Sequence, residues 1–169
     1  MTLRDYQQAL AEKVSRAGDS VAPLALLGFE SGDECWLVDL ADAGEVLPVP
    51  ALSGVPLTRP WFLGIANIRG TLYSVTDLAA FHGVAATPIR AESRLLLAGA
   101  RFGSNTALLM SRTQGLKSMA TLEPLPEAAA EARAQPWRGE RYRDGEGRTW
   151  THLLLPALLR ATQFIDIAA

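Results

Sequence analysis

Three acidic residues close together in the sequence are the first candidates for chemistry. Asp39, Asp42 and Glu45 supply carboxylates of the kind used in acid–base catalysis or in binding a divalent cation. Apolar residues alternate with them, a pattern typical of the solvent side of a strand and its turn. We therefore expect these carboxylates to face solvent and to hold no metal.

The histidines and the single cysteine are the other reactive side chains. His82 and His152 lie in different segments, without the spacing of metal ligands or of a catalytic triad, so we expect surface or packing roles. Cys35 lies in an apolar stretch and is expected to be a buried structural thiol. The glycines form no phosphate-binding loop, and no nucleophile elbow occurs. The sequence predicts no catalytic residue, no metal and no cofactor.

Residues 61–78 carry the most informative pattern, an apolar run followed by Asn-Ile-Arg-Gly and a second apolar run. This pattern predicts a tight β-hairpin. Gly70 can supply a positive φ at the turn, and Asn67 can hydrogen-bond the nearby backbone. Arg69 would then project from the rim of a sheet. Spacing alone is equally compatible with a merely solvated turn arginine.

Short strands must position this hairpin. Length and turn residues predict strands at 24–30, 35–40, 44–49, 61–68 and 71–78, then at 94–100, 106–111, 115–119 and 149–155. These strands are expected to form two successive meanders. Residues 122–137 contain three prolines and are predicted to be a loop with at most a short helical turn.

Helical patterns are confined to short segments. Residues 2–17 are predicted to form an amphipathic helix that ends at Gly18, with an apolar stripe made of Leu3, Tyr6, Leu10, Val14 and Ala17. Its apolar side is expected to pack on the protein itself, with docking to a partner as the alternative. Asp77 is expected to cap a short helix at 78–82, and a last helix is predicted at 156–162.

Composition excludes several classes of protein. Of the 169 residues, 49% are hydrophobic and 20% are charged, which is outside the range of disordered chains. The 16 Lys and Arg against 18 Asp and Glu give a net charge of −2, so no global positive field attracts nucleic acid or anionic lipid. Without a signal peptide or a long apolar run, we expect a soluble, intracellular protein that does not insert into membranes.

Three motifs resemble the CheW-like coupling domain of bacterial chemosensory systems: residues 64–70 (Gly-Ile-Ala-Asn-Ile-Arg-Gly), residues 75–78 (Val-Thr-Asp-Leu) and residues 44–47 (Gly-Glu-Val-Leu). The similarity extends from about Leu24 to Leu159. It implies a mainly β fold of two packed SH3-like barrels, each of about five strands, at 23–160. A helix and linker at 1–22 would precede this domain, a short helix would end it, and a tail at 161–169 would follow.

The resemblance implies an adaptor without catalytic activity. It would join the cytoplasmic tip of a methyl-accepting chemoreceptor to the regulatory domain of a CheA-type histidine kinase, in the cytoplasm at membrane-anchored arrays. By position, the receptor-facing residues are Glu45, Asn67 and Arg69, with an ion pair expected between Glu45 and Arg69. The kinase-facing candidates are Val46, Leu47, Val49 and Leu72.

The N-terminal segment, the proline-rich tract and residues 164–167 resemble the variant of the family that serves type IV pilus and twitching-motility systems. Ala43 and Ser74 depart from the family pattern, which affects contact details more than the fold. Two other functions stay open. One is a generic SH3-like module that binds another regulator or peptide through Trp36, Trp61 or residues 122–137. The other is a small enzyme that uses Asp39, Asp42, Glu45 or His152.

Overall fold

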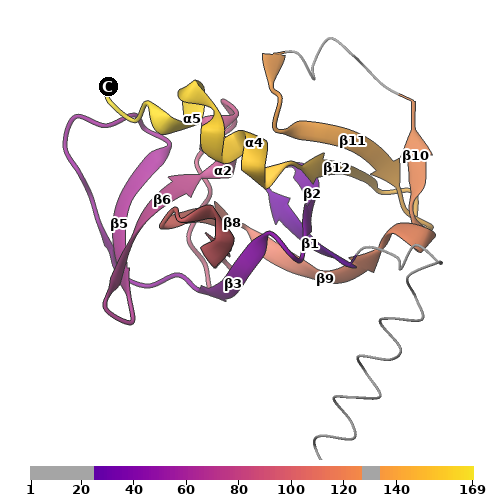
Figure 1. Cartoon of the computed structure of the whole chain (residues 1–169), viewed down its shortest axis with the longest axis horizontal. Coiled ribbons are helices and arrows are strands. Elements are labelled where there is room, and N and C mark those ends of the chain that lie inside the picture. The colour runs from indigo at the N-terminus through magenta and orange to yellow at the C-terminus, as the bar shows by residue number, and fades with distance from the viewer. Residues whose placement is uncertain (1–24, 127–133) are drawn as a thin grey trace, which may run out of the picture.

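The computed structural model describes residues 25–126 and 134–169 (Figure 1). The helix expected at 2–17 lies outside these residues. The helical turn expected in the middle of 122–137, around residues 127–132, lies outside them too. The described chain is mainly β, with two six-stranded sheets and a few short helices.

The first sheet, here called sheet A, contains strands from both ends of the described chain. Its order is β10-β11-β12-β2-β1-β9, and all its neighbours are antiparallel except β12 and β2. The bounds are Ala25–Ser31 for β1, Glu34–Asp39 for β2, Arg112–Ser118 for β9, Glu123–Leu125 for β10, Arg138–Arg143 for β11 and Thr149–Leu153 for β12.

The second sheet, sheet B, contains the middle of the chain. Its order is β3-β7-β8-β6-β5-β4, with β6 and β8 parallel and the other neighbours antiparallel. The bounds are Ala43–Pro48 for β3, Leu52–Ser53 for β4, Phe62–Ile68 for β5, Thr71–Asp77 for β6, Arg94–Ala98 for β7 and Thr106–Met110 for β8.

Short helices pack on the apolar core between the sheets. α2 (Leu78–Phe81) follows β6, while α4 (Leu155–Arg160) and α5 (Thr162–Ile165) follow β12. Figure 1 shows α4 and α5 between sheet B on the left and sheet A on the right. The helix expected at 156–162 is therefore two helices, and the second lies in the segment expected to be a tail. Among the described residues, no helix is long and apolar enough to span a membrane.

Three apolar cores stabilise this arrangement. The largest lies between the sheets and includes Trp36 and Val38 of β2, Leu96 of β7, Leu108 of β8 and residues of all three helices. A second core, which includes Val75 and Leu109, lies within the curl of sheet B. A third, around Leu37 and Trp150, lies within sheet A. Each sheet therefore has a core of its own in addition to the shared one.

The fold corrects two expectations. The two meanders are not successive, because β9 joins sheet A while β7 and β8 join sheet B. The two units are not closed five-stranded barrels either, since over residues 25–126 and 134–169 each sheet has six strands and its two edge strands do not pair with each other. Strand periodicity does not identify a distant pairing partner, so strand order could not be read from the alternation of apolar residues.

Three strands lie where a loop or nothing was predicted, and the shortest of them is β4. β10 falls in the proline-rich tract predicted to be a loop, and β11 was not predicted at all. In β11 only Tyr142 is buried, so the strand lacks the apolar alternation on which the sequence prediction relied.

Candidate functional site

The β5–β6 hairpin turns through two residues, Arg69 and Gly70. Both have positive φ, 51° and 84° respectively, the geometry of a type I′ turn. The backbone N–H of Gly70 donates to Asn67 Oδ1 at 2.9 Å, the local hydrogen bond expected from the sequence. The positive φ of Arg69 was not predicted, because this backbone conformation is uncommon for a residue with a side chain.

A second glycine of the motif lets β4 approach β5. Gly64 has a φ of 121°, and a Cβ atom there would lie 2.0 Å from the carbonyl oxygen of Ser53. A shift of register in the β5–β6 pairing occurs between Phe62 and Gly64. Glycine at this position is therefore required by both the backbone angle and the close approach of the neighbouring strand.

Glu45 lies on the edge strand β3, directly after a bulge. Ala43 pairs with Ala98 and Glu45 pairs with Leu97, so Gly44 is the extra residue. A Cβ atom on Gly44 would lie 2.9 Å from the carbonyl oxygen of Ala98. The glycine thus allows β3 to remain close to β7 while the side chain of Glu45 is exposed.

Arg69 and Glu45 form the ion pair expected from the resemblance. Arg69 Nη1 donates to Glu45 Oε1 at 3.0 Å, and Nη2 donates to Oε2. The hydrogen bond and the positive charge of Arg69 lower the pKa of Glu45, and Glu45 in turn raises the pKa of Arg69. The Arg69 side chain is 70% exposed and the Glu45 side chain is 42% exposed, so the pair forms a polar surface that a partner can contact.

The four kinase-facing candidates do not share one face. Val46 packs on the core between the sheets, whereas Leu47 and Val49 pack on the core of sheet B. All three are half-buried. Leu72 is 59% exposed and lies opposite Asn67 in the β5–β6 pair, beside the receptor-facing candidates. Leu72 is therefore the most accessible of the four.

Asp77 is the buried anchor at the end of β6. Its Oδ1 accepts from the backbone N–H groups of Ala79 and Ala80 at 3.1 and 3.4 Å, which caps α2 as expected. It also accepts from Thr87 Oγ1, while Oδ2 accepts from the Thr87 N–H, both at 2.7 Å. The contact with Thr87 was not predicted, and it ties the loop after α2 to the end of the hairpin.

The three carboxylates near β2 and β3 do not converge on one site. Asp39 lies 3.1 Å from His152 Nε2, Asp42 pairs with Arg101, and Glu45 pairs with Arg69. Among residues 25–126 and 134–169, no group of three His, Cys, Asp or Glu side chains could hold a metal ion.

The expected exposure of Asp42 is wrong. This residue is only 5% exposed because it lies under the η2 turn (Ala100–Phe102), where the Gly99 N–H donates to its carbonyl oxygen at 2.8 Å. Cys35 is half-buried at the edge of the sheet A core rather than fully buried, and desolvation raises the pKa of its thiol.

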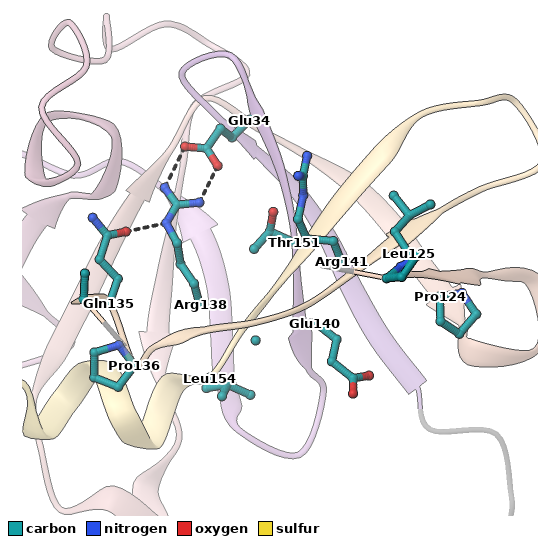
Figure 2. Close-up of a pocket in the computed structure, with 13 residues that line it drawn as sticks. Glu34, Pro124, Leu125, Gln135, Pro136, Arg138, Glu140, Arg141, Thr151 and Leu154 are labelled. Atoms are coloured by element: carbon teal, nitrogen blue, oxygen red, sulfur yellow. Dashed lines mark hydrogen bonds and ion pairs between the residues drawn. The ribbon is translucent and has the colours of Figure 1, made fainter. Parts of the chain in front are cut away.

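A groove of about 1170 Å³ lies beside β10, β11 and β12 (Figure 2). Pro124, Pro136 and Leu154 are among its apolar lining residues. At the groove, Arg138 donates to both carboxylate oxygens of Glu34 at 2.7 and 2.9 Å, and it also contacts Gln135. These hydrogen bonds lower the pKa of Glu34. The ion pair was not predicted, because its partners are joined only by the pairing of distant strands.

Comparisons with known proteins agree on one family. The family model described as "CheW-like domain" matches residues 25–163. Protein PilI of Pseudomonas aeruginosa is 31% identical over 88 residues, which are 52% of this chain, and the match spans about half (49%) of the length of PilI. Chemotaxis protein CheW of Helicobacter pylori is 23% identical over 126 residues, 74% of this chain and 76% of that protein.

A solved structure agrees with the architecture. The crystal structure of the scaffolding protein TtCheW from Thermoanaerobacter tengcongensis superposes with a TM-score of 0.64. The match covers 78% of this chain and 89% of that one, at 19% identity. At this level of identity the likeness concerns the fold alone.

Proposed function

Because the chain belongs to the CheW-like domain family, we propose that it is a non-catalytic adaptor that couples a chemoreceptor to a CheA-type histidine kinase. The receptor partner is the cytoplasmic tip of a methyl-accepting chemoreceptor, and the kinase partner is the regulatory domain. The protein then works in the cytoplasm, at arrays of membrane-anchored receptors, without nucleic acid, cofactor or direct insertion into the membrane.

The observation that carries this proposal is the exposed rim of sheet B. Asn67 holds the turn, the turn presents Arg69, and Arg69 pairs with Glu45 of the edge strand. The motif that carries the family resemblance thus builds an exposed, oriented polar surface rather than a buried core feature. We assign Glu45, Asn67 and Arg69 to the receptor contact.

The kinase contact is proposed at the neighbouring apolar side chains. Leu72 supplies the exposed anchor. Val46 and Leu47 of β3 and Val49 just after it are half-buried and would contribute from their own faces. Contacts of this kind are small, about 1,200 Å² or less, and micromolar in affinity. Multivalent contacts within an array raise the effective concentration and strengthen the assembly.

Similarity to PilI supports a narrower role. We propose that the output of this adaptor is control of type IV pilus twitching motility rather than flagellar chemotaxis. This step rests on the 31% identity to PilI and on the resemblance of the N-terminal segment, the proline-rich tract and residues 164–167.

The test is co-elution of the purified chain with the kinase regulatory domain and, separately, with the receptor tip, both from the same organism. We expect wild type to bind both, Arg69→Glu to lose the receptor, and Leu72→Asp to weaken the kinase complex. Leu72 is a better probe than Val46, because an aspartate at the half-buried Val46 would also disturb the core.

A matched control is Arg112→Glu. Arg112 is another exposed arginine, in the ion pair with Glu30 on sheet A, and its replacement is expected to leave both complexes intact. No binding of either partner at about 100 μM, well above a micromolar Kd, would contradict the coupling function.

The alternative function is a generic peptide-binding module, and the structure supports only one of the peptide sites that it would use. Trp36 is fully buried and cannot contact a peptide. The groove beside β10 and β11 is lined by prolines of the tract at 122–137, so a peptide could bind there. Peptide capture that depends on this groove, together with no binding to the kinase domain, would select this alternative. The enzyme hypothesis named Asp39, Asp42, Glu45 or His152, and only Asp39 and His152 of these lie together, while Asp42 and Glu45 pair with Arg101 and Arg69.

A further inference from the structure

A stack of aromatic rings connects the two sheets. Trp36 comes from β2 of sheet A, and His82 ends α2, which follows β6 of sheet B. Their rings are stacked, with centroids 5.1 Å apart and planes at 11°. Trp137, just before β11 of sheet A, also lies beside the imidazole, with centroids 6.2 Å apart and planes at 27°. The imidazole at the end of α2 thus contacts two indoles of sheet A.

One hydrogen bond within the stack requires a neutral histidine. The indole Nε1–H of Trp137 donates to His82 Nε2 at 2.9 Å. An indole nitrogen can only donate, so Nε2 must be the unprotonated nitrogen of the ring. A second proton on the imidazole would remove the acceptor and set two N–H groups against each other. Trp137 is 3% exposed, so its N–H has little access to water as a substitute.

Charged groups on the elements around His82 act on the same ring. The guanidinium of Arg138, on β11, lies 4.7 Å from the centroid of the Trp36 ring and is bound to Glu34 of β2. Burial is the main cause that lowers the pKa of His82, to about 4, and Arg138 adds to this effect. Glu34 and the backbone carbonyl of Leu78 in α2 oppose it. The ion pair at the groove therefore influences the proton affinity of a residue on the other sheet.

We propose that His82 is a proton-sensitive latch between the two sheets: the neutral ring joins them, and protonation separates Trp137 from α2 while each sheet remains folded. The last point follows from the packing, because each sheet also has a core of its own to which His82 does not belong, in addition to the core that the sheets share. The apolar core between the sheets remains, so the change is local to the contact of α2 with Trp137.

The test is NMR of the full-length chain between pH 7 and pH 3.5. The imidazole of His82 and the indole N–H of Trp137 are expected to change together, with a common midpoint near 4. The indole N–H of Trp150 is an internal reference, since it donates to Asp144 Oδ2. The hydrogen bond from Trp150 is the main cause that lowers the pKa of Asp144, so this signal is expected to move only at lower pH.

Charge variants give a signature that packing alone would not produce. Arg138→Gln removes a nearby positive charge and is expected to raise the midpoint, whereas Glu34→Gln is expected to lower it. His82→Gln keeps an acceptor that does not titrate, so the Trp137 signal is expected to become independent of pH. His152→Gln, at the histidine beside Asp39, is the matched control and is expected to leave the Trp137 titration unchanged.

Three results would overturn the latch. The first is a His82 ring that titrates near its ordinary value of 6.5, and the second is a Trp137 signal that ignores the titration of His82. The third is a single cooperative unfolding of both sheets before any change in the native Trp137 signal. The wild-type titration decides these points even if a variant does not fold.

Discussion

Arg69 and Glu45 join two parts of sheet B that no backbone hydrogen bond connects. Glu45 is on β3, the strand at one edge, and Arg69 is in the turn between β6 and β5 near the other edge. The sheet curls around its core so that these two side chains meet. The ion pair therefore bridges the open side of the curled sheet, where a closed barrel would pair its two edge strands.

A double-mutant cycle with Glu45→Gln and Arg69→Gln measures this connection. Both side chains are largely exposed, so we expect a favourable coupling in the free energy of unfolding at low salt that fades at high salt. Screening shortens the range of the interaction from ~10 Å at 0.1 M salt to ~3 Å at 1 M. Urea unfolding at both salt concentrations is the measurement, and a coupling that does not depend on salt would contradict the electrostatic origin.

Gly64→Ala is expected to destabilise the fold strongly. A methyl group would collide with the Ser53 carbonyl, and the φ of 121° is itself unfavourable for alanine. Backbone strain alone costs ~1–3 kcal/mol, and the collision adds to it. The matched control is Gly70→Ala, where φ is 84° but no atom lies within 4 Å of the added Cβ, so a loss of about 1 kcal/mol is expected. The free energy of unfolding of both variants is measured with urea. Equal losses of this free energy would show that the close contact with β4 does not contribute to stability.

Asp77→Asn tests the buried anchor after the hairpin. An amide cannot accept hydrogen bonds at both of its ends, so either the Thr87 N–H or the donors at the start of α2 lose their acceptor. A buried donor without a partner costs ~1–3 kcal/mol, and we expect a loss of about 2 kcal/mol in the free energy of unfolding. Thr87→Val removes only the hydroxyl contact and is expected to cost less. A stability equal to wild type in Asp77→Asn would mean that the cap is replaceable.

The stability of the protein is expected to fall as the pH is lowered from about 6.5 to about 4. The pKa of His82 is about 4 in the folded state against 6.5 for an ordinary histidine, so the unfolded chain binds the proton first. The stabilisation is complete above pH 6.5, is lost progressively below it, and is gone below about pH 4. The total amounts to about 3 kcal/mol.

Urea unfolding across this pH range measures the effect, and His82→Gln supplies the comparison. This variant has no titrating ring, so the difference in stability between wild type and variant is expected to change with pH over the same interval. A difference that stays constant between pH 7 and pH 4 would show that His82 titrates normally in the folded protein.

The sequence by itself determined the local features of this protein. The hairpin at residues 61–78, the positive φ of Gly70, the hydrogen bond of Asn67 and the cap formed by Asp77 all depend on residues close in the chain, where turn and capping preferences act directly. The family resemblance came from the same short segments. The mainly β character followed from strand lengths and turn residues.

Only the tertiary structure decided which strands pair and which distant side chains meet. The burial of Asp42, the ion pair of Arg138 with Glu34, and the contacts of His82 with Trp36 and Trp137 all depend on contacts far apart in sequence. Strand alternation specifies which face of a strand is apolar but not which strand lies beside it. The two open six-stranded sheets, and the proton-sensitive contact that we propose between them, therefore could not be derived from the order of residues alone.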